Sequence, residues 1–155
     1  MTTLNRRIVV GVDGSTSSRG ALRWAAAQAA LASAELEVVI GWSYPMSYGF
    51  PVIADVDWAA DARTTVEAEL TDVLGDQQVT VRVLEGHPAR VLLDASRDAD
   101  LLVVGSRGHG GFTGLLLGSV SEYVVTHASC PVVVVREPRQ RLETDAVVGE
   151  QVAAR

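Results

Sequence analysis

Residues 100–135 read DLLVVGSRGHGGFTGLLLGSVSEYVVTHASCPVVVV. A short apolar run ends at Gly105, and Gly108 and the pair Gly118-Ser119 follow with the spacing G-x2-G-x9-G-S. Glycine lets a backbone approach an anion closely, and a helix N-terminus offers unpaired N–H groups and a favourable dipole. A strand, a glycine-rich loop and a hydroxyl-bearing helix start, in this order, therefore predict a phosphate-binding site.

Short apolar runs alternate with helical patterns on the N-terminal side of this stretch. Because strands separated by helices indicate βαβ units and crossovers are right-handed, the chain is predicted to be an α/β protein with one doubly wound, five-stranded parallel sheet in the order 3-2-1-4-5 and helices on both faces. The segment 43–57 is predicted to be a long loop. The predicted strands are residues 7–12, 36–42, 79–84, 101–104 and 132–135; the predicted helices begin near residue 15 and cover 58–74, 88–97 and 118–128.

This strand order places the candidate site. Strands 1 and 4 are neighbours at the switch point, where ligands bind beyond the carboxyl ends of the strands. Asp13 follows the first strand and Gly105 follows the fourth, so both are expected to face one crevice. Residues 1–136 are predicted to form a single domain, and the polar segment 137–155 a weakly ordered tail.

Composition excludes several classes of protein. The chain has 155 residues, 48% of them apolar and 21% charged, which is typical of a soluble globular protein. Its net charge of -6 argues against nucleic-acid binding, and no apolar run approaches the length of a membrane span. A single cysteine, Cys130, cannot form an internal disulfide, which favours a reducing compartment, and we expect a cytoplasmic protein.

Catalytic motifs are largely excluded as well. All 13 basic residues are arginine, so a Walker-type phosphate lysine and a lysine base are absent from the chain. His87, His109, His127 and Cys130 lack metal-ligand spacing, and no nucleophile, base and orienting group stand together. No metal site is predicted with certainty, and ATP hydrolysis is expected to be slow at most.

The phosphate end of the site has candidates with alternatives. Backbone N–H groups around Gly105, Gly108 and Gly118 would cradle a polyphosphate, and Ser119 and Ser121 would donate hydroxyl hydrogen bonds. The alternative is that Ser119 only caps the helix.

The remaining candidates flank this end. Arg107 would pair with a phosphate or remain solvated. Asp13 would bind a ribose or a Mg²⁺ beside the phosphates, or only form an Asp-Gly turn. Trp42, at the end of strand 2, would pack on an adenine ring or belong to the core. His109 is expected in the loop near the phosphates.

Three segments, VVGVDGS (9–15), GHPARVLLDASRDADLLVVGSRGHGG (86–111) and LLLGSVSEYVVTHASCPVVVV (115–135), resemble the universal stress protein family over residues 6–136. The glycine–serine spacing resembles that of the family's nucleotide-binding branch. The resemblance implies an adenine nucleotide alpha hydrolase-like fold with ATP at the switch point, although some ATP-binding relatives carry a bulkier residue at Gly11. It places adenine near Asp13, Trp42 and Val104, and ribose and phosphates along Gly105, Gly108, Gly118, Ser119, Val120 and Ser121, with Gly11 and Val12 at the adjoining strand end.

The resemblance implies a nucleotide-dependent regulator of a stress response or of signalling. The expected ligand is ATP, alone or with Mg²⁺. There are three alternatives. The ligand would be cyclic AMP, or the protein would be an interaction module in which the nucleotide only stabilises a dimer, or it would be an enzyme, either an ATPase or a nucleotidyl-transfer protein. Members commonly pair through the last strand, and four valines at an uncovered sheet edge, Val132–Val135, favour a two-fold homodimer.

Overall fold

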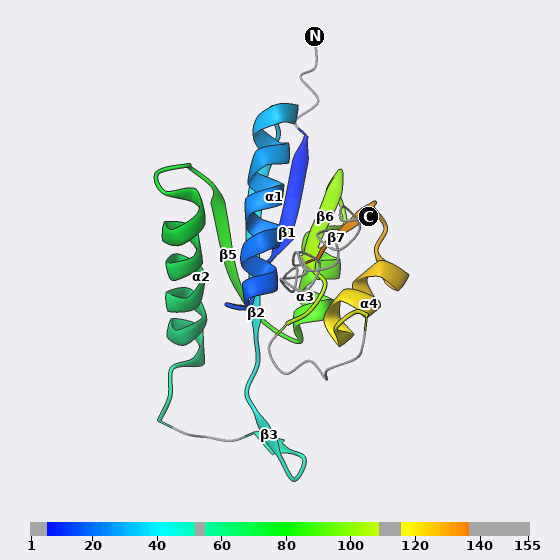
Figure 1. Ribbon diagram of the computed structural model, residues 1–155. Coiled ribbons are helices and arrows are strands. Elements are labelled where there is room, and N and C mark those ends of the chain that lie inside the picture. The colour runs from blue at the N-terminus through cyan, green and yellow to red at the C-terminus, as the bar shows by residue number, and fades with distance from the viewer. Residues whose placement is uncertain (1–5, 52–54, 109–115, 137–155) are drawn as a thin grey trace, which may run out of the picture.

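The computed structural model describes residues 6–51, 55–108 and 116–136, and its centre is a five-stranded parallel sheet (Figure 1). The strand order is β5-β2-β1-β6-β7, which is the predicted order 3-2-1-4-5 once the two short hairpin strands are left out of the numbering. β1 and β6 are adjacent, with Val10 opposite Val103. The strands are β1 (Arg7–Gly11), β2 (Glu35–Trp42), β5 (Thr80–Glu85), β6 (Leu101–Gly105) and β7 (Val132–Val135).

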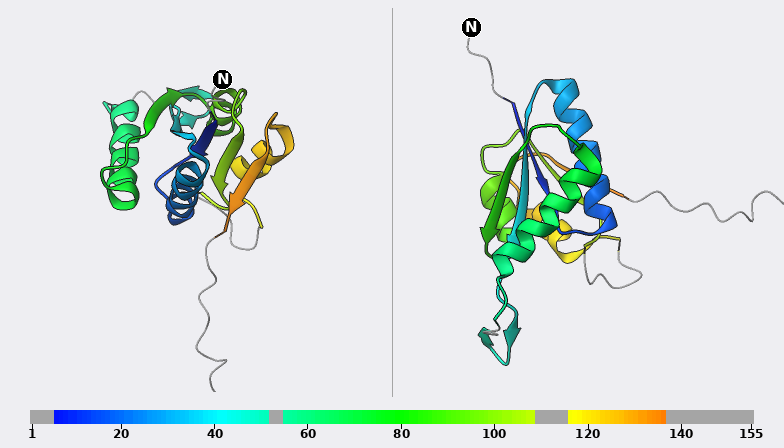
Figure 2. Two further views of the ribbon diagram at one scale, coloured as in Figure 1. Left: turned by 90° about the horizontal axis from the view of Figure 1, so that it is seen from above. Right: turned by 90° about the vertical axis from the view of Figure 1, so that its left-hand side faces the viewer.

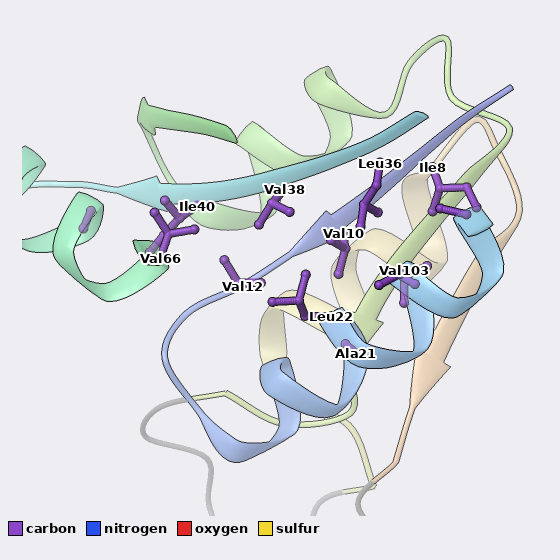
Figure 3. Packing of buried hydrophobic residues seen from close by; sticks show 14 residues of the cluster. Ile8, Val10, Val12, Ala21, Leu22, Leu36, Val38, Ile40, Val66 and Val103 are labelled. Atoms are coloured by element: carbon purple, nitrogen blue, oxygen red, sulfur yellow. The ribbon is translucent and has the colours of Figure 1, made fainter. Parts of the chain in front are cut away.

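Helices cover both faces of this sheet (Figure 2). α1 (Thr16–Ala32) and α2 (Trp58–Leu74) pack on one face, and α3 (Pro88–Ala95) and α4 (Ser119–His127) pack on the other. Side chains alternate along each strand, so Val38 faces the α1–α2 side and Val39 faces the α3–α4 side. Figure 3 shows the α1–α2 core, in which residues of β1, β2 and β6, together with Val12 just after β1, pack against α1 and α2. The residues on the sheet side are Ile8, Val10, Val12, Leu36, Val38, Ile40 and Val103, and those on the helices are Ala21, Leu22 and Val66.

Local signals set the helix starts. Ser15 is the N-cap of α1, and its hydroxyl accepts a hydrogen bond from the Ser18 N–H at 3.1 Å. Pro88 opens α3, where its missing N–H costs no helical hydrogen bond. α3 ends at Ala95, two residues before the predicted end.

The segment after β2 is the main correction to the predicted fold. Residues 46–51 form an antiparallel hairpin, β3 (Met46–Ser47) and β4 (Phe50–Pro51), where a loop was expected. Tyr48 and Gly49 both have positive φ, as a two-residue hairpin turn requires. The hairpin projects beyond the sheet (Figure 1), and the side chains of Met46, Tyr48 and Phe50 are exposed. The predicted tail, 137–155, lies outside the described residues.

No helix within the described part of the chain has both the length and the apolar character needed to span a membrane.

Candidate functional site

A cavity of about 440 Å³ lies at the carboxyl ends of β1, β2 and β6, on the α3–α4 side of the sheet. Its volume is within the usual range for small-molecule sites. The chain leaves β1 toward α1 on one face and leaves β6 toward α4 on the other, so this is the switch point of the fold. The predicted site residues that line the cavity are Gly11, Val12, Asp13, Val104, Gly105, Arg107, Gly108, Gly118, Ser119, Val120 and Ser121.

Asp13 joins the two loops at the cavity. Its Oδ1 accepts a hydrogen bond from the Ser15 N–H at 3.0 Å, so Asp13 stabilises this turn, as in the alternative to a ligand-binding role. A Cβ atom built at Gly108 would stand 2.5 Å from Oδ2 of Asp13. The carboxylate thus occupies the space that a side chain at position 108 would need, while also lining the cavity.

The start of α4 differs from a simple capped helix. Gly118 is the N-cap and no side chain caps it, so the alternative in which Ser119 caps this helix is wrong. The Gly118 N–H donates to the Ser106 carbonyl at 2.7 Å and is not available to a ligand. The N–H groups that an anion would meet are those of the next three residues, Ser119 to Ser121, in the first turn of the helix.

The two serines of α4 have different tasks. Ser121 is 5% exposed, and its Oγ donates to the Gly105 carbonyl at 2.6 Å. A hydroxyl has one hydrogen, so Ser121 ties α4 to the end of β6 and can only accept a further hydrogen bond. Ser119 is exposed on the cavity wall, which leaves it as the better hydroxyl donor to a ligand.

Gly105 serves packing more than ligand approach. A Cβ atom there would lie 2.5 Å from Oγ and 2.8 Å from the backbone carbon and oxygen of Ser17. The same Ser17 Oγ accepts a hydrogen bond from the Arg107 N–H at 3.2 Å. The start of α1 therefore shapes the loop after β6, and the Arg107 side chain lies exposed at the cavity.

One predicted site residue within the described part of the chain, Trp42, is not brought to the cavity. Trp42 packs against the α1–α2 core and meets the Tyr44 ring edge to face, with 5.4 Å between centroids. The strand alternation explains this, since Gly41 lines the cavity and the next residue points to the opposite face. The structure thus favours the core alternative for Trp42. His109 lies outside the described residues.

Several cavity residues were missed from the sequence, most of them apolar. Leu92 of α3 packs beside Gly11, where an added Cβ atom would meet its Cδ1 at 2.7 Å. Leu92, Val39 and Val104 come from the buried α3–α4 core and form an apolar wall. The cavity residues that were missed are Ser18, Val39, Gly41, Pro88, Leu92 and Leu117. For Val39 and Gly41, the alternation of side chains along β2 was the available signal.

No cluster of three or more histidine, cysteine, aspartate or glutamate side chains suited to a metal ion is present in residues 6–51, 55–108 and 116–136.

Comparison with known proteins shows the family of this chain. Residues 4–136 match the universal stress protein family. The universal stress protein Rv2623 of Mycobacterium tuberculosis is 37% identical over 137 residues, which cover 84% of this chain and 45% of that protein. A universal stress protein of Mycolicibacterium smegmatis is 36% identical over 138 residues, covering 83% of this chain and 47% of that protein. The chain thus spans about half the length of these curated relatives.

Solved structures show the same fold. The universal stress protein UspA of Lactobacillus plantarum superposes with a TM-score of 0.72 at 25% identity, covering 85% of this chain and 98% of that one. A universal stress protein crystallised in complex with cAMP superposes with a TM-score of 0.63 at 29% identity, covering 84% of this chain and 96% of that one. By its sequence match and by its fold, the chain belongs to the universal stress protein family.

Proposed function

We propose that this protein binds an adenine nucleotide, with ATP as the leading ligand, and that occupancy of the cavity regulates a stress-response or signalling partner. The observation that carries the proposal is the two-sided character of one cavity. Val39, Leu92 and Val104 provide an apolar wall suited to a base, and the uncapped first turn of α4 provides N–H groups suited to phosphate.

The charges around the cavity fit a nucleotide carried with Mg²⁺. Arg107 supplies a guanidinium that can pair with a phosphate. Asp13 supplies a carboxylate, the ligand type that Mg²⁺ prefers in proteins. The ion would neutralise part of the charge that Asp13 and a triphosphate bring together.

Binding rather than rapid turnover is the proposed activity. General base catalysis needs a proton acceptor within hydrogen-bond reach of the attacking water. Asp13 is the one carboxylate among the described residues that line the cavity, and its Oδ1 already accepts the Ser15 N–H. Hydrolysis is therefore proposed to be slow, in keeping with a nucleotide-dependent regulator.

Cyclic AMP is the second candidate ligand. The observation that favours it is the likeness to a universal stress protein solved with cAMP, at 29% identity over nearly the whole of that chain. A single phosphate needs only the first turn of α4, whereas three phosphates need Arg107 and the loop as well. In a third reading, the nucleotide only stabilises a dimer that acts as an interaction module.

The test is a calorimetric titration of nucleotide-stripped protein with ATP and Mg²⁺, then with cyclic AMP. Gly118→Ala is the informative variant, because a Cβ atom at that position meets its nearest heavy atoms at 3.5 Å, an ordinary contact, and its φ of -71° suits alanine. The fold should tolerate the methyl group while the approach of a phosphate does not. Gly20→Ala on α1, whose Cβ atom would lie 3.8 Å from Val135, is the matched control.

We expect one ATP site per chain in the wild type and in Gly20→Ala, and weak or no binding in Gly118→Ala. Binding of cyclic AMP alone would transfer the proposal to that ligand. Equal ATP affinity in Gly118→Ala and the wild type would overturn the phosphate site at α4.

A homodimer and a cytoplasmic location complete the proposal. β7 lies at one end of the sheet and pairs with β6 alone among the described strands. The carbonyls of Pro131 and Val135 accept hydrogen bonds from the N–H groups of Leu102 in β6 and of Ser106 just after it. By alternation, the backbone groups of Val132 and Val134 point outward. Backbone N–H and C=O groups that point outward from an edge strand can form hydrogen bonds with the same strand of a second copy of the chain. The single cysteine, Cys130, supports a reducing compartment such as the cytoplasm.

A further inference from the structure

A fully buried acid lies behind the loop that carries Asp13. Glu69 of α2 is 1% exposed and continues the buried stripe made by Ala62 and Val66. Glutamate is almost never fully buried unless it is paired. A glutamate at a core position of an amphipathic helix therefore needs an explanation.

The two oxygens of this carboxyl group have unequal surroundings. Oε1 lies 2.9 Å from the Ser18 hydroxyl. Oε2 is buried and makes no hydrogen bond of ordinary geometry among the described residues, and the Gly14 backbone, which lowers the pKa of this carboxyl group, is its other polar support. A buried carboxylate with an unsatisfied oxygen is costly, whereas a neutral carboxylic acid in the same place costs less.

The hydroxyl of Ser18 shows which form of Glu69 fits. Its Oγ lies 3.3 Å from the Asp13 nitrogen, 3.0 Å from the Ser15 carbonyl and 2.9 Å from the glutamate oxygen. The Asp13 N–H can only donate and the Ser15 carbonyl can only accept, while a hydroxyl has one hydrogen and two lone pairs. All three contacts are satisfied together only when Glu69 carries a proton and donates it to Ser18. An ionised Glu69 competes with the Ser15 carbonyl for the single Ser18 hydrogen.

The surroundings of Glu69 include some groups that raise its pKa and others that lower it. Burial is the largest influence and raises its pKa, and the Asp13 carboxylate in the loop raises it further. The Ser18 hydroxyl, the Gly14 backbone and the Arg19 guanidinium on α1 lower the pKa, and the net direction is upward. Arg19 also lies 3.9 Å from Asp72 of α2, on the exposed side of the helix pair.

This network touches the cavity directly. Ser18 and Asp13 both line it, and the Asp13 carboxylate adjoins Gly108 of the opposite loop. A change in the Ser18 hydrogen bonds therefore acts on the cavity wall.

We propose that Glu69 is a positioning residue for the nucleotide cavity: as a neutral acid it donates to Ser18, holds residues 13–15 and the start of α1 in their binding shape, and links ligand affinity to one proton. This inference rests on the proposed nucleotide binding. In it, the Glu69 O–H bonds to Ser18 Oγ, and the Ser18 O–H bonds to the Ser15 carbonyl. Loss of the Glu69 proton turns the Ser18 hydrogen toward the carboxylate and releases that carbonyl.

The variants follow from this hydrogen-bond pattern. Glu69→Gln places an NH₂ donor where the acid O–H stands and cannot ionise, so it mimics the protonated state at every pH. Glu69→Ala removes the donor altogether. Glu67→Gln is the matched control, since it makes the same chemical change at an exposed position on the same helix.

The first measurement is ATP affinity as a function of pH. In the wild type and in Glu67→Gln, we expect affinity to fall by up to about tenfold per pH unit above the pKa of Glu69, in addition to any titration of ATP itself. In Glu69→Gln this component should vanish and the low-pH affinity should remain, while Glu69→Ala should bind weakly at every pH. The same pH profile in Glu69→Gln and the wild type would overturn the proposal.

A second measurement needs no nucleotide. In the ligand-free protein, the Glu69 carboxyl carbon observed by NMR should titrate above the ordinary range of glutamate, and the amide resonances of Asp13 and Ser15 should shift with the same midpoint. A wild type that binds no adenine nucleotide at any pH would refute the proposed function, and these resonances would still decide the role of Glu69. The positioning role would be overturned if the Glu69 carboxyl group titrated in the ordinary glutamate range, or if the amide resonances of Asp13 and Ser15 did not shift with its midpoint.

Discussion

Gly105 at the end of β6 lies directly against Ser17 in the first turn of α1, with no room for a side chain between them. Gly105→Ala would press a Cβ atom onto the Ser17 backbone, which cannot rotate aside as a side chain can. Overpacking of this kind costs about 1–3 kcal/mol, and we expect a loss of that size in the free energy of unfolding measured with urea. Gly118→Ala provides the contrast and should keep wild-type stability. Equal stability of the two variants would contradict the packing described for Gly105.

Arg107 is expected to matter for affinity and not for folding. Its side chain is exposed at the cavity, and a hydrogen bond to a charged group contributes about 1.5–3 kcal/mol at most. Arg107→Ala should weaken ATP binding about tenfold and change unfolding by less than about 0.5 kcal/mol. Arg97→Ala is the control, because Arg97 pairs with Asp94 on the surface at 2.8 Å, away from the cavity. A calorimetric Kd for Arg107→Ala that equals the control value would exclude a phosphate contact.

A buried ion cluster on the α3 side of the sheet should contribute measurably to stability. Glu37 is 6% exposed and pairs with Arg7 of β1 and Arg82 of β5, each at 2.9 Å. Glu37→Gln leaves both arginines without their anion, although both are partly solvated, so a loss of about 1–2 kcal/mol is expected. Asp72→Asn, which breaks the exposed Arg19 pair, should change urea unfolding far less. A smaller loss for Glu37→Gln than for this control would show that the cluster is energetically neutral.

The raised pKa of Glu69 also predicts how stability depends on pH. The folded state holds the Glu69 proton at pH values where the unfolded chain has lost it. The unfolding free energy from this group is therefore highest below the ordinary glutamate range and falls as pH rises through the folded-state pKa. The difference in unfolding free energy between the wild type and Glu69→Gln should show this slope when urea curves are compared across pH. A difference that stays constant or grows in favour of the wild type would contradict it.

The outward backbone of β7 gives a specific test of dimerisation. Val134→Pro removes an N–H that points away from β6 and leaves the β6 pairing intact, since proline is tolerated on the open side of an edge strand. Light scattering at micromolar concentration should report a dimer for the wild type and a monomer for this variant. A monomeric wild type would rule out the homodimer.

Most of the fold could be predicted because it depends on local patterns. Apolar runs and helical spacing located the five main strands, and the crossover rule supplied their order. The Tyr48-Gly49 hairpin was missed because the prolines, the glycine and the aromatic residues of segment 43–57 were interpreted as one long loop. Turn residues with positive φ were its available signal.

The site was predicted less completely, for reasons of tertiary structure. The glycine spacing located the cavity, and strand alternation would have moved Trp42 to the core. The bond from Ser121 to the Gly105 carbonyl spans 16 residues, and the bond from Ser18 to Glu69 spans 51. Neither pairing has a local sequence signal, so the use of these two hydroxyls became visible only in the folded chain.

The β3–β4 hairpin has a practical consequence. Its tip, with Tyr48 fully exposed, stands clear of the sheet, beyond the end of β2 (Figure 1). Backbone at such a tip tolerates added sequence because little depends on its conformation. A short epitope or a fluorescent reporter inserted between Tyr48 and Gly49 would therefore attach a label to the folded protein without entering the five-stranded sheet.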